Sequence, residues 1–119
     1  MAVSAGMTKS SDTPDRGDVV WLDFSPQLGR EQAGIRPALI LSPKSYNRKV
    51  GLMLVCPITS KIKGYPFEVR IKSAKIDGVV LADQIKSIDW HARKLSFAGH
   101  APPDTIEQTQ QVAELLIKA

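Results

Sequence analysis

The stretch Gly51–Ile58 reads GLMLVCPI and is apolar almost throughout. A run of this length, rich in Leu, Met and Val, is typical of a strand that is buried on both faces. Such a strand needs neighbours along its edges and cover on its two faces. The segments on either side of it therefore decide the fold class.

Shorter strand patterns flank this run. Asp77-Gly78 is a turn signal, and Trp21, in the middle of the first predicted strand, is expected in the core. The chain ends in a predicted helix that opens at Pro102-Pro103-Asp104 and runs to about Lys118. Its expected apolar face holds Ile106, Thr109, Ala113, Leu116 and Ile117. The other predicted strands are Gly17–Phe24, Arg36–Ser42, Phe67–Lys72, Val79–Ile88 and Leu95–Gly99, with one helical turn within Pro43–Val50.

Five or six short strands followed by one helix close most simply into a small barrel that the helix caps. The predicted fold class is therefore mainly β with a C-terminal helix, in the form of an SH3-like barrel. The chain has 119 residues, which suits one domain, placed at residues 15–119. Residues 1–14, MAVSAGMTKSSDTP, are small and polar, and we expect a disordered tail there.

Composition excludes several classes of protein. No apolar run approaches the roughly 20 residues of a membrane-spanning helix, and the N-terminus lacks the apolar core of a signal peptide. The single cysteine, Cys56, rules out an internal disulfide and a cysteine-based zinc site. We expect it to be a buried thiol, with a nucleophilic cysteine as the alternative. These features predict a cytoplasmic protein.

Charge is distributed unevenly along the chain. Residues 1–29 carry two basic and four acidic side chains, residues 30–94 carry thirteen and five, and residues 95–119 carry one and three. A positive field confined to the middle of the chain is typical of a protein that binds a polyanion such as nucleic acid. An ordinary lysine-rich surface in water is the alternative.

The best candidate for chemistry lies at two predicted strand ends. Arg36 opens one strand directly after a glycine-containing loop, and Thr59 ends another, followed by Ser60, Lys61 and Lys63. If the two ends are neighbours, a guanidinium and two hydroxyls meet beside two ammonium groups. Such a set would bind a phosphate and stabilise added charge on it. Purely structural roles, such as an ion pair of Arg36 with a nearby carboxylate, remain open at this point.

Other chemistries have weaker support. The chain has no glycine-rich phosphate loop, and its acidic residues form no tight cluster, so we predict neither a metal site nor a cofactor. His91 and His100 are the only imidazoles. They are candidates for an acid and a base, but we expect them at the surface or in turns.

The ordered motifs closely resemble those of the MazF/PemK family of toxin–antitoxin endoribonucleases. The match extends over almost all of residues 15–119. The matching stretches, in order, are Gly17–Phe24 with Ser25-Pro26, EQAGIRPALILSP (31–43), Tyr46-Asn47, Cys56–Thr59, KGYPFEV (63–69) and DGVVLADQIKSIDW (77–90).

The resemblance implies a homodimer that cleaves single-stranded RNA at short sequence motifs, leaving a 2′,3′-cyclic phosphate and a 5′-hydroxyl. The family's catalytic arginine and threonine fall on Arg36 and Thr59, and a loop glutamate found in some members falls on Glu31. Glu31 is the candidate general base, or the group that orients Arg36. The predicted RNA-binding residues are Arg30, Gln32, Ser60, Lys61, Lys63, Tyr65, Gln84 and Lys86.

A toxin of this kind needs an inhibitor, and the resemblance implies an antitoxin whose acidic, disordered C-terminal tail covers the basic groove. Two other functions remain open. One is a CcdB-like toxin that poisons DNA gyrase without cutting RNA. The other is an SH3-like module that binds RNA and leaves it intact.

Overall fold

The computed structural model describes residues 12–25, 29–32, 34–73 and 75–119. Most of the predicted tail, residues 1–11, lies outside the described residues. The rest of it packs on the domain, with Thr13 and Pro14 buried. The side-chain amide of Asn47 donates a hydrogen bond to the Pro14 carbonyl oxygen over 2.8 Å. The described chain is therefore ordered slightly ahead of the predicted start of the domain.

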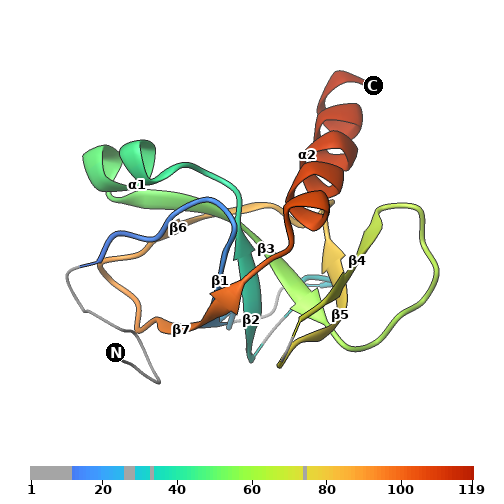
Figure 1. Cartoon of the computed structure of the whole chain (residues 1–119), viewed down its shortest axis with the longest axis horizontal. Coiled ribbons are helices and arrows are strands. Elements are labelled where there is room, and N and C mark those ends of the chain that lie inside the picture. Colours follow the sequence, from blue (N-terminus) through green and yellow to red (C-terminus); the bar gives the residue numbers. More distant parts are fainter. Residues whose placement is uncertain (1–11, 26–28, 33, 74) are drawn as a thin grey trace.

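Within the described residues, seven strands and two helices form a curled sheet with a C-terminal helix, which confirms the predicted fold class (Figure 1). The strands are β1 (Asp18–Asp23), β2 (Ile35–Ile40), β3 (Leu52–Thr59), β4 (Glu68–Lys72), β5 (Asp77–Leu81), β6 (Lys86–Asp89) and β7 (Ser96–His100); the helices are α1 (Lys44–Val50) and α2 (Pro103–Lys118).

The central strand is β3, as its apolar sequence predicts. Strand β2 pairs with one of its edges, and the other edge is shared by two strands. Strand β6 pairs with residues 52–55 of β3, whereas β5 pairs with Ile58 and Thr59. All of these pairings are antiparallel. The sheet order is β4-β5-β3-β2-β1-β7, with β6 joining at β3.

The single strand predicted at Val79–Ile88 is wrong. The chain leaves the edge of β3 after Leu81 and makes a tight turn. In this turn the Gln84 backbone N–H donates a hydrogen bond of 3.1 Å to the Leu81 carbonyl oxygen. It rejoins the same edge of β3 at Lys86, where β6 begins. One straight strand cannot follow the curled edge of β3 along its whole length. The residues between Leu81 and Lys86 therefore form a connection between two separate strands, β5 and β6.

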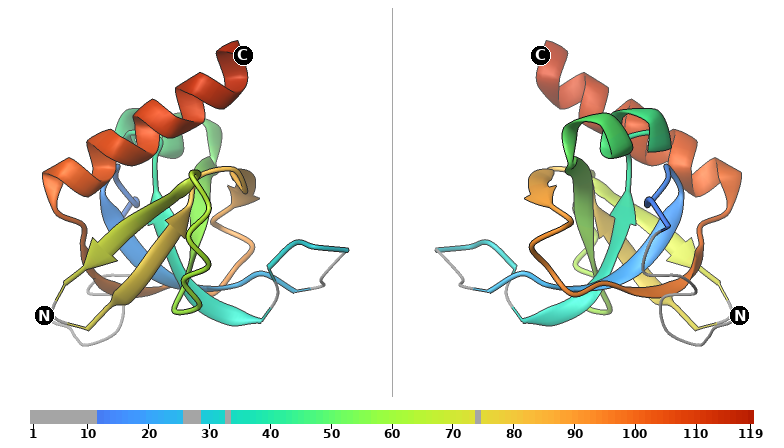
Figure 2. Two further views of the ribbon diagram at one scale, coloured as in Figure 1. Left: turned by 90° about the vertical axis from the view of Figure 1, so that its right-hand side faces the viewer. Right: turned by 90° about the vertical axis from the view of Figure 1, so that its left-hand side faces the viewer.

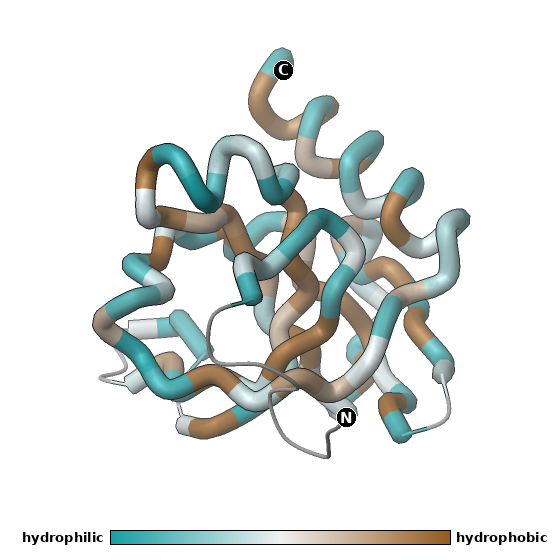
Figure 3. Tube along the Cα trace, turned by 60° about the vertical axis from the view of Figure 1, so that its left-hand side comes forward, coloured by the Kyte–Doolittle hydropathy of each residue, from teal (hydrophilic) through white to brown (hydrophobic). Residues whose placement is uncertain are grey.

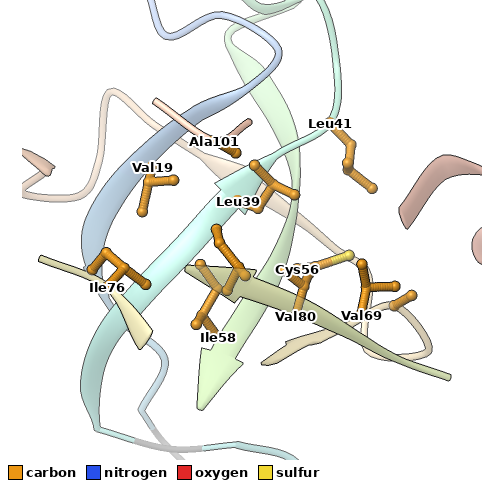
Figure 4. Close-up of a cluster of buried hydrophobic side chains, with 11 residues drawn as sticks. Val19, Leu39, Leu41, Cys56, Ile58, Val69, Ile76, Val80 and Ala101 are labelled. Atoms are coloured by element: carbon orange, nitrogen blue, oxygen red, sulfur yellow. The ribbon is translucent and has the colours of Figure 1, made fainter. Parts of the chain in front are cut away.

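Apolar side chains on both faces of β1, β2 and β3 form two buried clusters, which explains the continuous apolar runs. Figure 3 shows the apolar strands inside the molecule, and Figure 4 shows the cluster that faces α2. Leu39 belongs to one cluster and its neighbour Ile40 to the other, as alternating strand side chains require. Trp21, expected in the core, is 40% exposed. It points outward because Val20 and Leu22, on either side of it, point inward.

The two helices cover the sheet from one side (Figure 2). Helix α1 is longer than the predicted single turn and ends at Gly51, whose φ of 83° is the left-handed conformation that favours glycine. Helix α2 buries Thr105, Thr109 and Ala113 against the sheet. The predicted apolar face fails near its C-terminus, where Leu116 and Ile117 are exposed because the helix extends past the sheet. No helix within the described part of the chain is long and apolar enough to span a membrane.

Candidate RNA-binding groove and catalytic site

Strand register places the two candidate catalytic residues near each other. In the β2–β3 pair, Ala38 lies opposite Pro57. Arg36 lies two residues before Ala38 and Thr59 lies two residues after Pro57, so both residues follow the same end of the paired segment. Both residues line one groove. The condition that the sequence left open, that these strand ends are neighbours, is therefore met.

This groove has a volume of about 1080 Å³ and runs across the ends of β2 and β3. Every residue that we predict to act in catalysis or RNA binding lines it, with the exception of Lys86. The structure brings them together from two strands and three loops that are distant in sequence. The full lining is Gly29, Arg30, Glu31, Gln32, Arg36, Thr59, Ser60, Lys61, Lys63, Tyr65, Phe67, Glu68, Leu81, Asp83 and Gln84.

The basic loop between β3 and β4 is held in place by the carboxylate of Glu68, the first residue of β4. Glu68 accepts hydrogen bonds from the backbone N–H groups of Lys63 (3.2 Å) and Gly64 (3.0 Å). The Tyr65 and Phe67 rings stack, with their centroids 5.2 Å apart. These contacts fix the loop at the groove and leave Tyr65 half exposed, with an aromatic face near the expected path of a nucleic acid.

The connection between β1 and β2 is tied to the connection between β5 and β6. The Gln32 backbone N–H donates to Gln84 Oε1 over 3.1 Å, and Lys86 Nζ lies 3.4 Å from Glu31 Oε1. The described residues of the β1–β2 connection extend away from the barrel in both views of Figure 2. Lys86 does not itself line the groove. Its connection to the predicted site is the ion pair with Glu31.

Charges in the groove suit a phosphate diester. The lining includes four basic residues, Arg30, Arg36, Lys61 and Lys63, and three acidic ones. The Thr59 hydroxyl oxygen accepts a hydrogen bond from the Lys61 backbone N–H over 3.2 Å. Its own hydrogen therefore remains available to donate to a ligand. A guanidinium and a hydroxyl together can donate to the two non-bridging oxygens of one phosphate.

Two carboxylates in the groove were missed as site residues by the sequence analysis. Burial raises the pKa of Asp83, and the nearby negative charge of Glu68 adds to the shift. The charged form of Asp83 is therefore disfavoured where it stands. The only sequence signal is that Asp83 and Gln84 interrupt an otherwise apolar stretch, which is also what an ordinary turn would show.

We expect Asp83→Asn to stabilise the protein slightly at neutral pH. The pKa of Asp83 is higher in the folded state than its ordinary 3.8. As the pH rises above 3.8, Asp83 therefore ionises more readily in the unfolded chain, and the free energy of unfolding falls. The amide removes this cost. The gain should not exceed about 0.5 kcal/mol, since the side chain is partly exposed and screened by water. Thermal unfolding of both proteins should give midpoints that converge as the pH falls below 3.8; a variant less stable at neutral pH contradicts this account.

The alternative chemistries have little structural support. Burial raises the pKa of the Cys56 thiol to about 12, so the thiol stays protonated and is a poor nucleophile. His91 stacks on Trp90 with a centroid distance of 3.9 Å, and His100 Nδ1 lies 3.1 Å from Asp18 Oδ1. Neither histidine lines the groove, and both are exposed, as expected. Within the described ranges, no three His, Cys, Asp or Glu side chains gather as metal ligands.

Comparison with known proteins gives a consistent result. Residues 15–117 match the family model described as "PemK-like, MazF-like toxin of type II toxin-antitoxin system". The chain is 48% identical over 104 residues to the endoribonuclease toxin MazF of Escherichia coli K12, covering 87% of this chain and 94% of the relative. It is 36% identical to the endoribonuclease toxin ChpB of the same strain, over 86% of this chain and 91% of the relative.

Solved structures agree with this result. The crystal structure of MazF from Deinococcus radiodurans superimposes with a TM-score of 0.86 at 45% identity, covering 92% of this chain and 100% of the other. A MazE–MazF complex from the same organism gives a TM-score of 0.80 at 46% identity, covering 91% of this chain and 98% of the other. On the evidence of the groove, the fold and these matches, this chain belongs to the family of PemK-like and MazF-like toxins of type II toxin–antitoxin systems.

Proposed function

We propose that this endoribonuclease cuts single-stranded RNA by activating the RNA's own 2′-hydroxyl, and that it is the toxin of a toxin–antitoxin pair. The observation that carries the proposal is that Arg36 and Thr59 line one groove together with Arg30, Lys61 and Lys63. Phosphates of a single strand would follow these cations, and the 2′-hydroxyl is what distinguishes RNA from DNA at such a site.

The reaction requires stabilisation of a five-coordinate phosphorus. The 2′-oxygen attacks the adjacent phosphorus in line, the bond to the 5′-oxygen breaks, and a 2′,3′-cyclic phosphate and a 5′-hydroxyl result. The Arg36 guanidinium donates to the oxygens that gain charge, and the Thr59 hydroxyl donates one further hydrogen bond. These donors are worth more in the transition state than in the ground state, which is what accelerates the step.

A base must take the proton of the 2′-hydroxyl, and the 5′-oxygen must receive a proton, from water or from the protonated base, as its bond to phosphorus breaks. A guanidinium is a poor general base because it has no free lone pair with which to accept a proton. Glu31 is the candidate base, since it lines the same groove and its carboxylate is positioned by Lys86 at 3.4 Å. An alternative role for Glu31 is to orient the Arg36 guanidinium.

The partners of this reaction follow from the charge of the groove and from the family. An antitoxin with an acidic, disordered C-terminal tail would compete with RNA for the same cations. The MazE–MazF complex of Deinococcus radiodurans, to which this chain is similar, supports a partner of this kind. We further propose that the protein acts as a homodimer in the cytoplasm, where cutting messenger RNA would inhibit translation.

The proposed reaction needs no metal ion, so EDTA should leave it intact. Purified protein incubated with a long single-stranded RNA in EDTA is expected to give discrete fragments at an undiminished rate, because the cations that act are Arg36 and its neighbours. End mapping should find 5′-hydroxyls that a kinase can label directly. Loss of cleavage in EDTA with recovery on adding Mg²⁺, or 5′-phosphate ends, contradicts the proposal. DNA damage that depends on gyrase, without RNA cleavage, supports the CcdB-like alternative.

A further inference from the structure

A second, smaller hollow of about 230 Å³ adjoins the groove. Its apolar lining is formed by Phe24 and Pro57, which are buried, and Ile85, which is half-buried. It shares part of its wall with the groove, and Glu31 and Asp83 line both spaces. A ligand bound along the groove can therefore extend one group into the hollow without leaving its path.

The two spaces differ in charge. The groove has four basic residues against three acidic ones, whereas the hollow has Glu31 and Asp83 against Lys86 only. Lys86 is already engaged by Glu31 at 3.4 Å. A phosphate would be repelled at this hollow and attracted in the groove. The part of an RNA strand that fits the hollow is thus an uncharged one, with an apolar body and hydrogen-bonding edges, which describes a nucleobase.

The polar edge of the hollow narrows the choice of base. The Asp83 carboxylate only accepts hydrogen bonds, and the Gln84 side-chain oxygen already accepts one from the Gln32 backbone N–H. An exocyclic amino group, as in cytosine, adenine or guanine, can donate to such an acceptor. Uracil has a carbonyl oxygen in its place, so a uracil held in the same orientation would face the carboxylate with a second acceptor, and its one donor, N3–H, could reach the carboxylate only in a different orientation.

We propose that this hollow takes one nucleobase of the bound RNA, that Asp83 reads the base's exocyclic amino group, and that this contact contributes to the sequence preference of the enzyme. The proposal rests on the proposed function, because the strand that presents the base is the one held in the groove. Desolvation disfavours the charged form of Asp83 at this position. A carboxylate that lowers the stability of the fold agrees with a role in binding.

The test uses binding in the absence of cleavage. Short single-stranded oligonucleotides of random sequence, 2′-deoxy at every position and with uracil as the fourth base, lack the attacking hydroxyl and stay intact. Wild-type protein should enrich sequences in which one position excludes uracil. Asp83→Asn should lose that exclusion, since its amide presents donors as well as an acceptor. Glu107→Gln, the same chemical change at an exposed position of α2, should retain it.

A cycle of protein and base changes then isolates the contact. Removing only the exocyclic amino group from the preferred base should weaken wild-type binding by roughly 5- to 100-fold. The same change should have little effect on Asp83→Asn. An unchanged preference in Asp83→Asn, or a pool in which no position excludes uracil, overturns the inference while RNA cleavage by the wild type still supports the proposed function. A wild type that neither cuts nor binds RNA overturns both.

Discussion

Arg36→Ala is expected to cut single-stranded RNA at least about 100-fold more slowly than the wild type. Arg36 lines the same groove as Thr59. In the proposed reaction its guanidinium is the charged donor to the oxygens that gain negative charge. Removing one donor from a site of this kind costs about 2.7–4 kcal/mol of transition-state stabilisation. Single-turnover cleavage of a labelled oligonucleotide, with saturating protein, measures this loss directly.

Matched variants separate chemistry from charge and folding. Arg48→Ala removes an exposed arginine from the last turn of α1, and it should cleave at the wild-type rate. Arg36→Lys retains the charge but loses the forked geometry of the guanidinium, so we expect only partial recovery. Thr59→Val should slow the same step by a smaller factor, because the threonine donates one neutral hydrogen bond. Full activity of a folded Arg36→Ala protein would falsify the assignment.

Gly78→Ala is expected to lower both the stability of the fold and the rate of RNA cleavage. A Cβ at Gly78 would overlap the Thr59 carbonyl oxygen and lie 2.9 Å from the Thr59 carbonyl carbon. Both atoms belong to the backbone, so the clash cannot be relieved by rotating a side chain, and β5 must move away from β3. Overpacking of this kind costs about 1–3 kcal/mol. Displacement of Thr59 should also reduce cleavage by the protein that remains folded.

The control for this variant is Gly99→Ala in β7. A Cβ at Gly99 has no atom within 4 Å, although its φ of 150° makes a substitution there strained. We therefore expect some loss of stability and an unchanged cleavage rate per folded molecule. Chemical denaturation gives the free energy of unfolding, and single-turnover kinetics below the unfolding transition give the rate. A Gly78→Ala protein that retains both wild-type values would show that β5 and β3 separate without cost.

Local patterns in the sequence predicted most elements of this protein. The apolar run at 51–58 identified β3, the alternation at Phe67–Lys72 identified β4, and the prolines before Asp104 marked the start of α2. These predictions succeed because a strand or a helix end depends on side chains within a few residues of one another. The site residues came from the motifs that resemble the family, since nothing in the spacing of Arg36 and Thr59 requires them to meet.

The remaining features depend on contacts between distant segments. The pairing of β2 with β3 places Arg36 and Thr59 at the same end of the paired segment, and the shared edge of β3 divides the apolar stretch after Gly78 into two strands. Trp21 is exposed because the sheet buries the other face of β1, which carries Val20 and Leu22. Asp83 lies between the groove and the smaller hollow because the fold brings the β5–β6 connection to both spaces. Sequence by itself determined most of the segments that are strands and helices, and it indicated which side chains could act on a phosphate. Only the tertiary structure decided which of them share one groove, because strand pairing joins residues whose separation along the chain is unrelated to their separation in space.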